Sequence, residues 1–139
     1  MVVVVLIGLL AAIALPAFKR VQTKSRATVI VNNLRQFASA YEQYATEFGK
    51  WPPDSLQTVV PPGMDGRLPI AWTQTFESGY QYDWDTNVNG IAASVSIELN
   101  GGDVNDPIFQ MVDQILDDGN TSTGSFRYVS DRYMYILQN

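Results

Sequence analysis

Few residues of this sequence are suited to chemistry, because it contains neither cysteine nor histidine. Their absence excludes disulfides, thiolate nucleophiles, the usual zinc sites and Ser-His-Asp triads. Most general-base chemistry near neutral pH is excluded as well, and carboxylates, tyrosines and lysines remain as the only candidate catalysts. An enzyme is therefore disfavoured.

Two carboxylates flank an aromatic residue in the segment Asp83-Trp84-Asp85. Alternate side chains of a strand share a face, so both carboxyl groups would lie on one side, about 7 Å apart. Such a pair could act as acid and base in glycoside hydrolysis, with aromatic side chains as a sugar platform. The alternative, which we favour, is an acidic pair at the solvent edge of a hairpin with the aromatic residues in the core.

A second oxygen-rich run extends from Asp117 to Gly124 and combines carboxylates, an amide and hydroxyls with two glycines. Calcium requires hard oxygen ligands, which makes Asp117, Asp118 and Asn120 candidate calcium ligands. The run lacks the Glu that closes an EF-hand loop. A calcium site and a simple helix-ending turn are the two interpretations, and no other cofactor is indicated.

The acidic pair must be held by a β-hairpin. Tyr80 and Tyr82 alternate with polar residues, residues 91–99 alternate as well, and Asn89-Gly90 between them is a turn signal. The preceding stretch, 51–68, is rich in Pro and Gly and is predicted to be an ordered loop, with a short helical turn at Ser55 to Val60.

The oxygen-rich run must follow a helix and precede strands. Asp106-Pro107 is a helix start, and apolar residues then recur at i, i+3, i+4 and i+7 from Ile108 to Leu116. The apolar face of this helix is expected to pack on the sheet. Alternation from Phe126 to Leu137 predicts the last strand or strands.

The N-terminal segment, residues 1–18, contains only apolar residues, Gly and Pro. As a helix it would extend about 27 Å, close to the ~30 Å core of a bilayer. A secretory signal would need a basic region ahead of the apolar run, and a soluble chain of this size could not surround such a helix. A membrane segment that continues into a longer helix is therefore favoured.

Helical periodicity continues through residues 19–49, where Leu34, Phe37 and Tyr41 belong to one apolar stripe. Gly49 suits the left-handed position after a helix, and Trp51-Pro52-Pro53 cannot extend it. One helix of nearly 50 residues is predicted, followed by a globular region at 50–139. The fold class is α+β, with a long N-terminal helix, membrane-spanning in its first half, packed on a small antiparallel sheet.

Charge is distributed unevenly along the chain. Residues 1–50 carry six Lys/Arg and two Glu, whereas residues 51–139 carry three Arg and twelve Asp/Glu, within a total net charge of −5. The acidic body disfavours nucleic acid as a partner. The basic residues Lys19, Arg20, Lys24 and Arg26 follow the apolar run and are interpreted as a membrane-edge cluster.

The segment Met1 to Phe18 closely resembles the N-terminal segment of type IV pilins and pseudopilins. Asn33-Leu34-Arg35-Gln36 and Phe48-Gly49-Lys50-Trp51-Pro52 resemble the major pseudopilins of type II secretion systems, with Tyr41 and Tyr44 between them. The resemblance implies a type IV pilin-like fold and a structural subunit rather than a catalyst. Major pseudopilins also bind calcium in a C-terminal loop, but their ligand motif does not align with this sequence.

The resemblance further implies a precursor that a prepilin peptidase cleaves and that is methylated on its new N-terminus. It would be held in the bacterial inner membrane by a single pass, with its globular domain in the periplasm. An inner-membrane assembly platform would then add it to a homo-oligomeric pseudopilus, together with other pseudopilins or minor pilins, for protein secretion. A leader and the first mature residues, a glutamate among them, are expected to precede Met1.

The basic cluster conflicts with this orientation, because the positive-inside rule would place the globular domain in the cytoplasm. Basic residues of the expected leader would oppose that bias, and the cluster would then face anionic headgroups at the periplasmic side.

Filament and membrane contacts are assigned to the apolar part of the helix. Its residues are Val2, Val3, Val4, Val5, Leu6, Ile7, Gly8, Leu9, Leu10, Ala11, Ala12, Ile13, Ala14, Leu15, Pro16 and Ala17. Gly8 and Pro16 are expected to kink or unwind the helix between them. They are interpreted either as a functional hinge or simply as residues that are common in membrane helices. The alternative function is a monomeric, membrane-anchored periplasmic binding domain.

Overall fold

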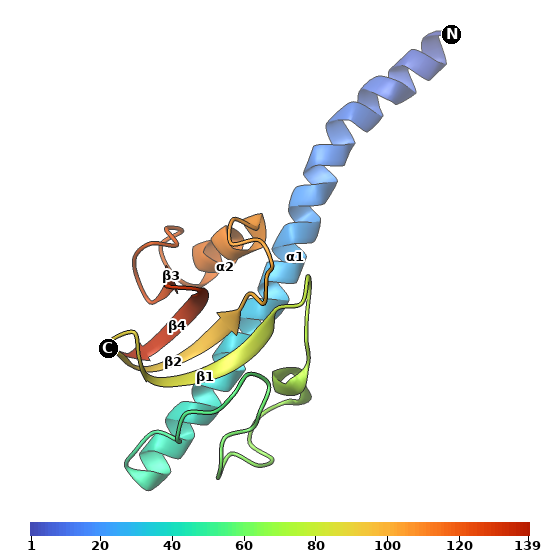
Figure 1. The fold of residues 1–139 in the computed structure, drawn as a ribbon. Helices are drawn as coiled ribbons and strands as arrows, with labels where there is room; N and C mark the ends of the chain where they lie inside the picture. Colours follow the sequence, from blue (N-terminus) through green and yellow to red (C-terminus); the bar gives the residue numbers. More distant parts are fainter.

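The computed structural model describes all residues 1–139 and has one dominant element, helix α1, Val2–Phe48. The N-terminal half of α1 projects away from the rest of the molecule, and the globular part lies along its C-terminal half (Figure 1). Gly49 has φ 71°, and its N–H donates to the carbonyl of Ala45 at 2.8 Å. The predicted helix end is therefore confirmed, because glycine adopts the left-handed conformation without steric cost.

Helix α1 remains α-helical through Gly8 and Pro16, so the expected unwound stretch is absent from the isolated chain. Loss of the Pro16 N–H removes one hydrogen bond, and the remaining ladder is sufficient to keep the helix continuous. The predicted apolar stripe is buried and extends further toward the N-terminus than expected, as far as Ala27. Phe48, at its other end, is half exposed.

The segment after α1 is an irregular loop and differs from prediction in one detail. Residues 55–60 form no helical turn. The Val59 N–H donates to the carbonyl of Leu56 at 3.0 Å, but Thr58 has φ 60°, so the turn at Gln57 and Thr58 is not helical. A short 3₁₀ helix, η1, forms instead at Ile70–Thr73. The reason is tertiary, since the Thr58 N–H donates to the carbonyl of Tyr82 at 2.9 Å and is thereby bonded to the sheet instead of a local helix.

The predicted α+β architecture is confirmed by a four-stranded antiparallel sheet in the order β1-β2-β4-β3. Strands β1, Gln81–Val88, and β2, Ile91–Glu98, form the predicted hairpin, and Asn89 and Gly90 between them both have positive φ. Strands β3, Phe126–Val129, and β4, Arg132–Gln138, form the second hairpin, with β4 paired to β2. The final two strands of the chain are thus brought beside the first two.

Helix α2, Pro107–Leu116, connects the two hairpins. The side chain of Asp106 accepts a hydrogen bond from the Ile108 N–H at 3.0 Å, which caps the helix as predicted. Helix α2 lies against α1 and meets the sheet through Phe109, whose ring stacks on Tyr133 of β4 at 4.2 Å. Its apolar face is therefore shared between α1 and the sheet.

The core lies between α1 and the inner face of the sheet and is largely aromatic. Tyr41 of α1 stacks on Trp84 of β1 with ring centroids 3.8 Å apart, and Phe37 packs edge-on against Tyr82 at 4.7 Å. These contacts confirm the assignment of the aromatic residues to the core. They also point Tyr82 and Trp84 toward α1, so the alternating residues Asp83 and Asp85 lie on the outer face.

Candidate functional site

Three features of the structure are candidates for function. The first is the apolar half of α1, which makes no contact with its own globular domain. Its large side chains are all more than half exposed, for example Leu10 at 68% and Ile13 at 72%. It is the one helix that is long and apolar enough to cross a membrane.

The second feature is a group of three carboxylates at the C-terminal end of α2. Oxygen atoms of Asp113, Asp117 and Asp118 all lie within 4.8 Å of one another. Asp113 is on the last turns of α2, Asp117 is the residue that ends the helix, and Asp118 begins the following loop. Helix spacing of four residues places Asp113 and Asp117 on the same side.

Asp113 is fully buried, and neither of its carboxylate oxygens has a hydrogen-bond partner. No lysine or arginine forms an ion pair with any member of the group. Burial, followed by the charges of Asp118 and Asp117, raises the pKa of Asp113 to about 6. An unpaired buried carboxylate is costly, so this arrangement needs a proton or a cation to offset it.

The loop after α2 is folded around the other two carboxylates. Asp117 Oδ2 accepts hydrogen bonds from the N–H groups of Ser125 and Phe126. Asp118 accepts from the Asn120 N–H at 2.8 Å and from the Thr123 hydroxyl at 2.9 Å, and these bonds lower its pKa. Both side chains are therefore fixed by the loop beside Asp113.

Gly124 has a specific role in this loop. Its φ is 80°, and a Cβ atom there would overlap Asp117 Oδ2. Only glycine permits this close approach of the backbone to the carboxylate.

The structure assembles a different set of oxygens from the predicted calcium ligands. Asp117 and Asp118 are together as expected, but the Asn120 side-chain oxygen accepts from the Ser122 N–H at 3.1 Å and shapes the loop. Asp113 takes the third place. The spacing of four residues between Asp113 and Asp117 could have indicated that Asp113 belongs to the group. Asp113 lies within an amphipathic helix, however, where a single Asp is ordinarily expected to face solvent.

The chemistry of this donor set suits a hard divalent cation. Three carboxylates converge at the negative end of the α2 dipole, and calcium binds carboxylate oxygens in flexible geometry. Asp113, Asp117 and Asp118 would hold the ion, and its charge would compensate the buried carboxylate of Asp113.

We expect calcium to stabilise the full chain in detergent micelles by binding this group. At a calcium concentration about 100 times its Kd, mass action adds about 2.7 kcal/mol, which raises the Tm by about 10 °C. Asp113→Asn should abolish the calcium response and raise the Tm in EDTA, because it removes the unpaired buried charge. Near-UV circular dichroism with calcium or EDTA measures both effects.

Asp65→Asn is the matched control, because Asp65 is exposed and outside the group. It should leave the calcium response unchanged. If the unaltered chain has the same Tm in calcium and in EDTA, the calcium site is contradicted, and residues 117–124 serve only as a turn that ends α2.

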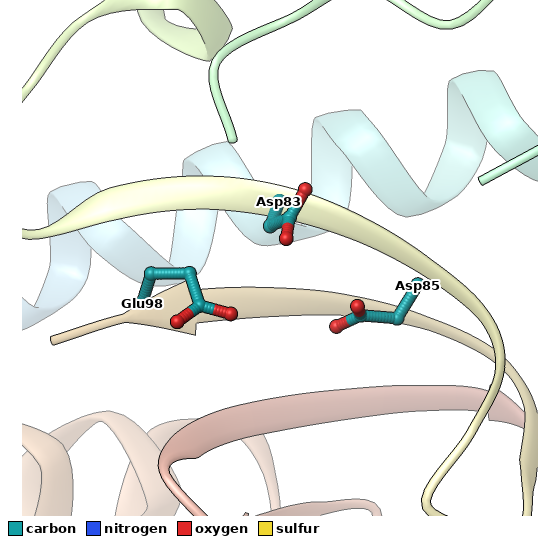
Figure 2. Close-up of side chains that lie close together, drawn as sticks. All are labelled: Asp83, Asp85 and Glu98. Atoms are coloured by element: carbon teal, nitrogen blue, oxygen red, sulfur yellow. The ribbon is translucent and has the colours of Figure 1, made fainter. Parts of the chain in front are cut away.

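The third feature is the carboxylate pair considered for catalysis. The structure corrects its expected position at the solvent edge, because Asp83 is 6% exposed and Asp85 is 3% exposed. Glu98 of β2, also buried, completes a trio whose oxygens lie within 4.8 Å of one another. Figure 2 shows Asp85 and Glu98 extending toward each other, with Asp83 beside them.

Arg132 of β4 neutralises part of this trio. One guanidinium nitrogen, Nη1, lies 2.9 Å from Asp85 Oδ1 and 3.6 Å from Asp83 Oδ2, and it also contacts Glu98 Oε1. Because β4 pairs with β2 and not with β1, Arg132 reaches across β2 to hold the first strand. No sequence pattern indicated this ion pair, since Arg132 is 47 positions from Asp85.

The remaining bonds of the trio are made within the sheet. The Trp84 N–H donates to Asp83 Oδ1 at 2.9 Å, and the Ser96 hydroxyl donates to Asp85 Oδ2. Burial and, second, the charge of Asp85 raise the pKa of Asp83 to about 7, and burial also raises the pKa of Glu98. The buried position and the shared arginine suit a cross-strand ion-pair network better than acid–base chemistry on a substrate.

The raised pKa values predict that the folded domain loses stability between about pH 4 and pH 7. Asp83 and Asp113 have an ordinary pKa of 3.8, and in the folded chain these values are about 7 and about 6. In this window the folded state holds protons that the unfolded state has released, so the free energy of unfolding falls as pH rises. Each group contributes a slope of at most about 1.4 kcal/mol per pH unit.

Urea unfolding of the full chain in micelles with EDTA, measured from pH 5 to pH 8, tests this expectation. Asp83→Asn should flatten the profile up to pH 7, and Asp65→Asn should leave it unchanged. An Asp83→Asn profile as steep as that of the unaltered chain would show that the Asp83 pKa is not raised.

Comparison with protein-family models, curated protein sequences and solved structures gives no match. The fold and the three features define a class: an α+β chain with an exposed helical segment able to cross a membrane and a compact domain packed on the continuation of that helix.

Proposed function

We propose that the chain is a structural subunit of a type IV pilus-like filament, a pseudopilus in protein secretion, and not an enzyme. The observation that carries the proposal is the exposed apolar half of α1, continuous with a half whose apolar stripe is buried in the domain. One continuous helix thus joins an apolar segment, whose exposure to water is unfavourable, to the globular domain. Membrane insertion and packing against other copies both remove that segment from water.

Two details favour a filament over a simple anchor. The segment is apolar on all sides, so it can be surrounded by neighbouring helices as well as by lipid. Its residues Gly8, Ala11, Ala12, Ala14 and Ala17 are small and allow close approach of helices, which drives association in lipid. Gly8 and Pro16 would still be the positions where α1 extends locally during extraction.

The location follows from the same proposal. The subunit would be held by a single pass in a bacterial inner membrane with its domain in the periplasm, before it joins other pseudopilins or minor pilins. The prepilin peptidase and the assembly platform would be its partners in processing and polymerisation. The resemblance of residues 1–18 and 33–52 to pseudopilins supports these partners.

The test is to express the gene with its upstream reading frame and its own assembly machinery, and to shear and isolate filaments. Mass spectrometry should identify this chain in the filaments, with a methylated N-terminus upstream of Met1. Recovery of the chain only as an unprocessed membrane monomer would overturn the filament and leave the membrane-anchored binding domain as its function.

A further inference from the structure

A groove of about 410 Å³ lies between α1 and α2, directly beyond the apolar half of α1. It is lined by Arg20, Val21, Lys24, Met111, Gln114 and Ile115. The α1 side carries two positive charges, and the α2 side is mainly apolar. No carboxylate lines the groove.

The two cations of the groove are free for a ligand. Arg20 and Lys24 are exposed and form no ion pair, whereas the next basic residue, Arg26, pairs with Glu77 at 3.4 Å. Val21, between them, is 67% exposed. A ligand that satisfies all these groups needs a negative charge next to an apolar part.

The position of the groove along the membrane normal indicates where such a ligand would come from. This position rests on the proposed membrane insertion of residues 2–18. At 1.5 Å per residue, Arg20 lies about 3 Å and Lys24 about 9 Å beyond Phe18. The headgroup layer is roughly 5–8 Å thick on each side of the hydrocarbon core. The groove would therefore open at the level of the lipid phosphates.

We propose that this groove binds the headgroup of an anionic phospholipid. Arg20 and Lys24 hold the phosphate, and the glycerol and upper acyl carbons contact Val21, Met111 and Ile115. The bound lipid fixes α2, and with it the globular domain, against the membrane surface.

The test uses the full chain in nanodiscs of phosphatidylcholine and phosphatidylglycerol, with native mass spectrometry of the lipids retained on release. The unaltered chain should retain phosphatidylglycerol selectively. Each basic residue at an anionic surface contributes about 1 kcal/mol, so Arg20→Gln/Lys24→Gln should lower retention about 30-fold. Met111→Ser/Ile115→Ser should also lower it, because the apolar wall of the groove is lost.

Lys19→Gln/Arg35→Gln is the charge-matched control, because both residues are exposed and neither lines the groove. It should lower retention about 5-fold at most, since only Lys19 lies near the surface. Equal losses in the two double variants would overturn the proposal in favour of diffuse attraction. Displacement of phosphatidylglycerol by inorganic phosphate would overturn it in favour of a free-phosphate site.

The remaining outcomes separate this proposal from the filament. Unchanged lipid retention with loss of filaments in Arg20→Gln/Lys24→Gln would overturn it and assign the groove to a second copy of the chain. Failure of the unaltered chain to enter nanodiscs would contradict membrane insertion itself. Loss of retained lipid with normal filaments would support the lipid site.

Discussion

Replacing Arg132 with methionine is expected to destabilise the folded domain by about 3–5 kcal/mol at pH 8. The guanidinium contacts Asp83, Asp85 and Glu98, so its removal leaves three buried carboxylates without a counter-charge. Methionine keeps much of the side-chain volume, which separates the loss of charge from the loss of packing. Urea unfolding of the full chain in micelles, followed by tryptophan fluorescence, measures the change because Trp84 is fully buried.

Arg127→Met is the matched control. Arg127 lies on β3 of the same sheet, and its guanidinium donates to the Gly124 carbonyl at 3.0 Å without pairing to a carboxylate. Its loss should cost about 1 kcal/mol. The deficit of Arg132→Met should shrink at pH 5, where Asp83 is protonated. Equal destabilisation by the two variants, or a deficit that does not depend on pH, would contradict the ion-pair network.

Replacing Leu10 with aspartate is expected to lower membrane insertion on the order of 100-fold and to abolish filaments. Aspartate at the centre of a membrane helix costs roughly 3 kcal/mol relative to an apolar residue. Leu10 is 68% exposed and touches nothing in the globular domain, so the domain should stay folded. The carbonate-resistant membrane fraction and the yield of sheared filaments measure the two effects.

Gln36→Asp adds the same charge to an exposed position on the C-terminal half of α1 and should leave membrane insertion unchanged. A circular dichroism spectrum confirms that both variants are folded. Normal insertion of Leu10→Asp would show that the apolar half of α1 is not the membrane segment.

Most elements of the fold could be predicted because their signals are local. Gly49 followed by two prolines ends α1, Asn89-Gly90 forms the first hairpin, and Asp106-Pro107 starts α2. Each of these signals depends on the backbone conformations that one to three residues can adopt, and these restrictions are the same in any tertiary context. The helical turn predicted at 55–60 was wrong, because the Thr58 N–H bonds to the sheet. Of the kink or unwound stretch expected between Gly8 and Pro16, the unwound form is absent, because the hydrogen bonds of α1 continue past both residues.

The candidate sites were predicted only in part. Asp117 and Asp118 were recognised from their composition, but the third carboxylate, Asp113, depends on how the end of α2 meets the following loop. Alternation correctly put Asp83 and Asp85 on one face of β1, and their burial was missed. Periodicity shows which residues share a face, but it does not show whether other parts of the chain pack against that face and bury it.

The sequence by itself determined an apolar helix of membrane length, its amphipathic continuation, the first hairpin, the strand character of residues 126–137 and the acidic character of the domain. These properties are fixed by composition and by spacings of two to four residues. Only the tertiary structure decided which charges are buried and which partners they have. The strand order β1-β2-β4-β3 brings Arg132 across β2 to Asp85, and the packing of α2 against α1 encloses Asp113. Such contacts join residues far apart in the chain, and electrostatic energies depend on distance and burial, which only the folded chain defines.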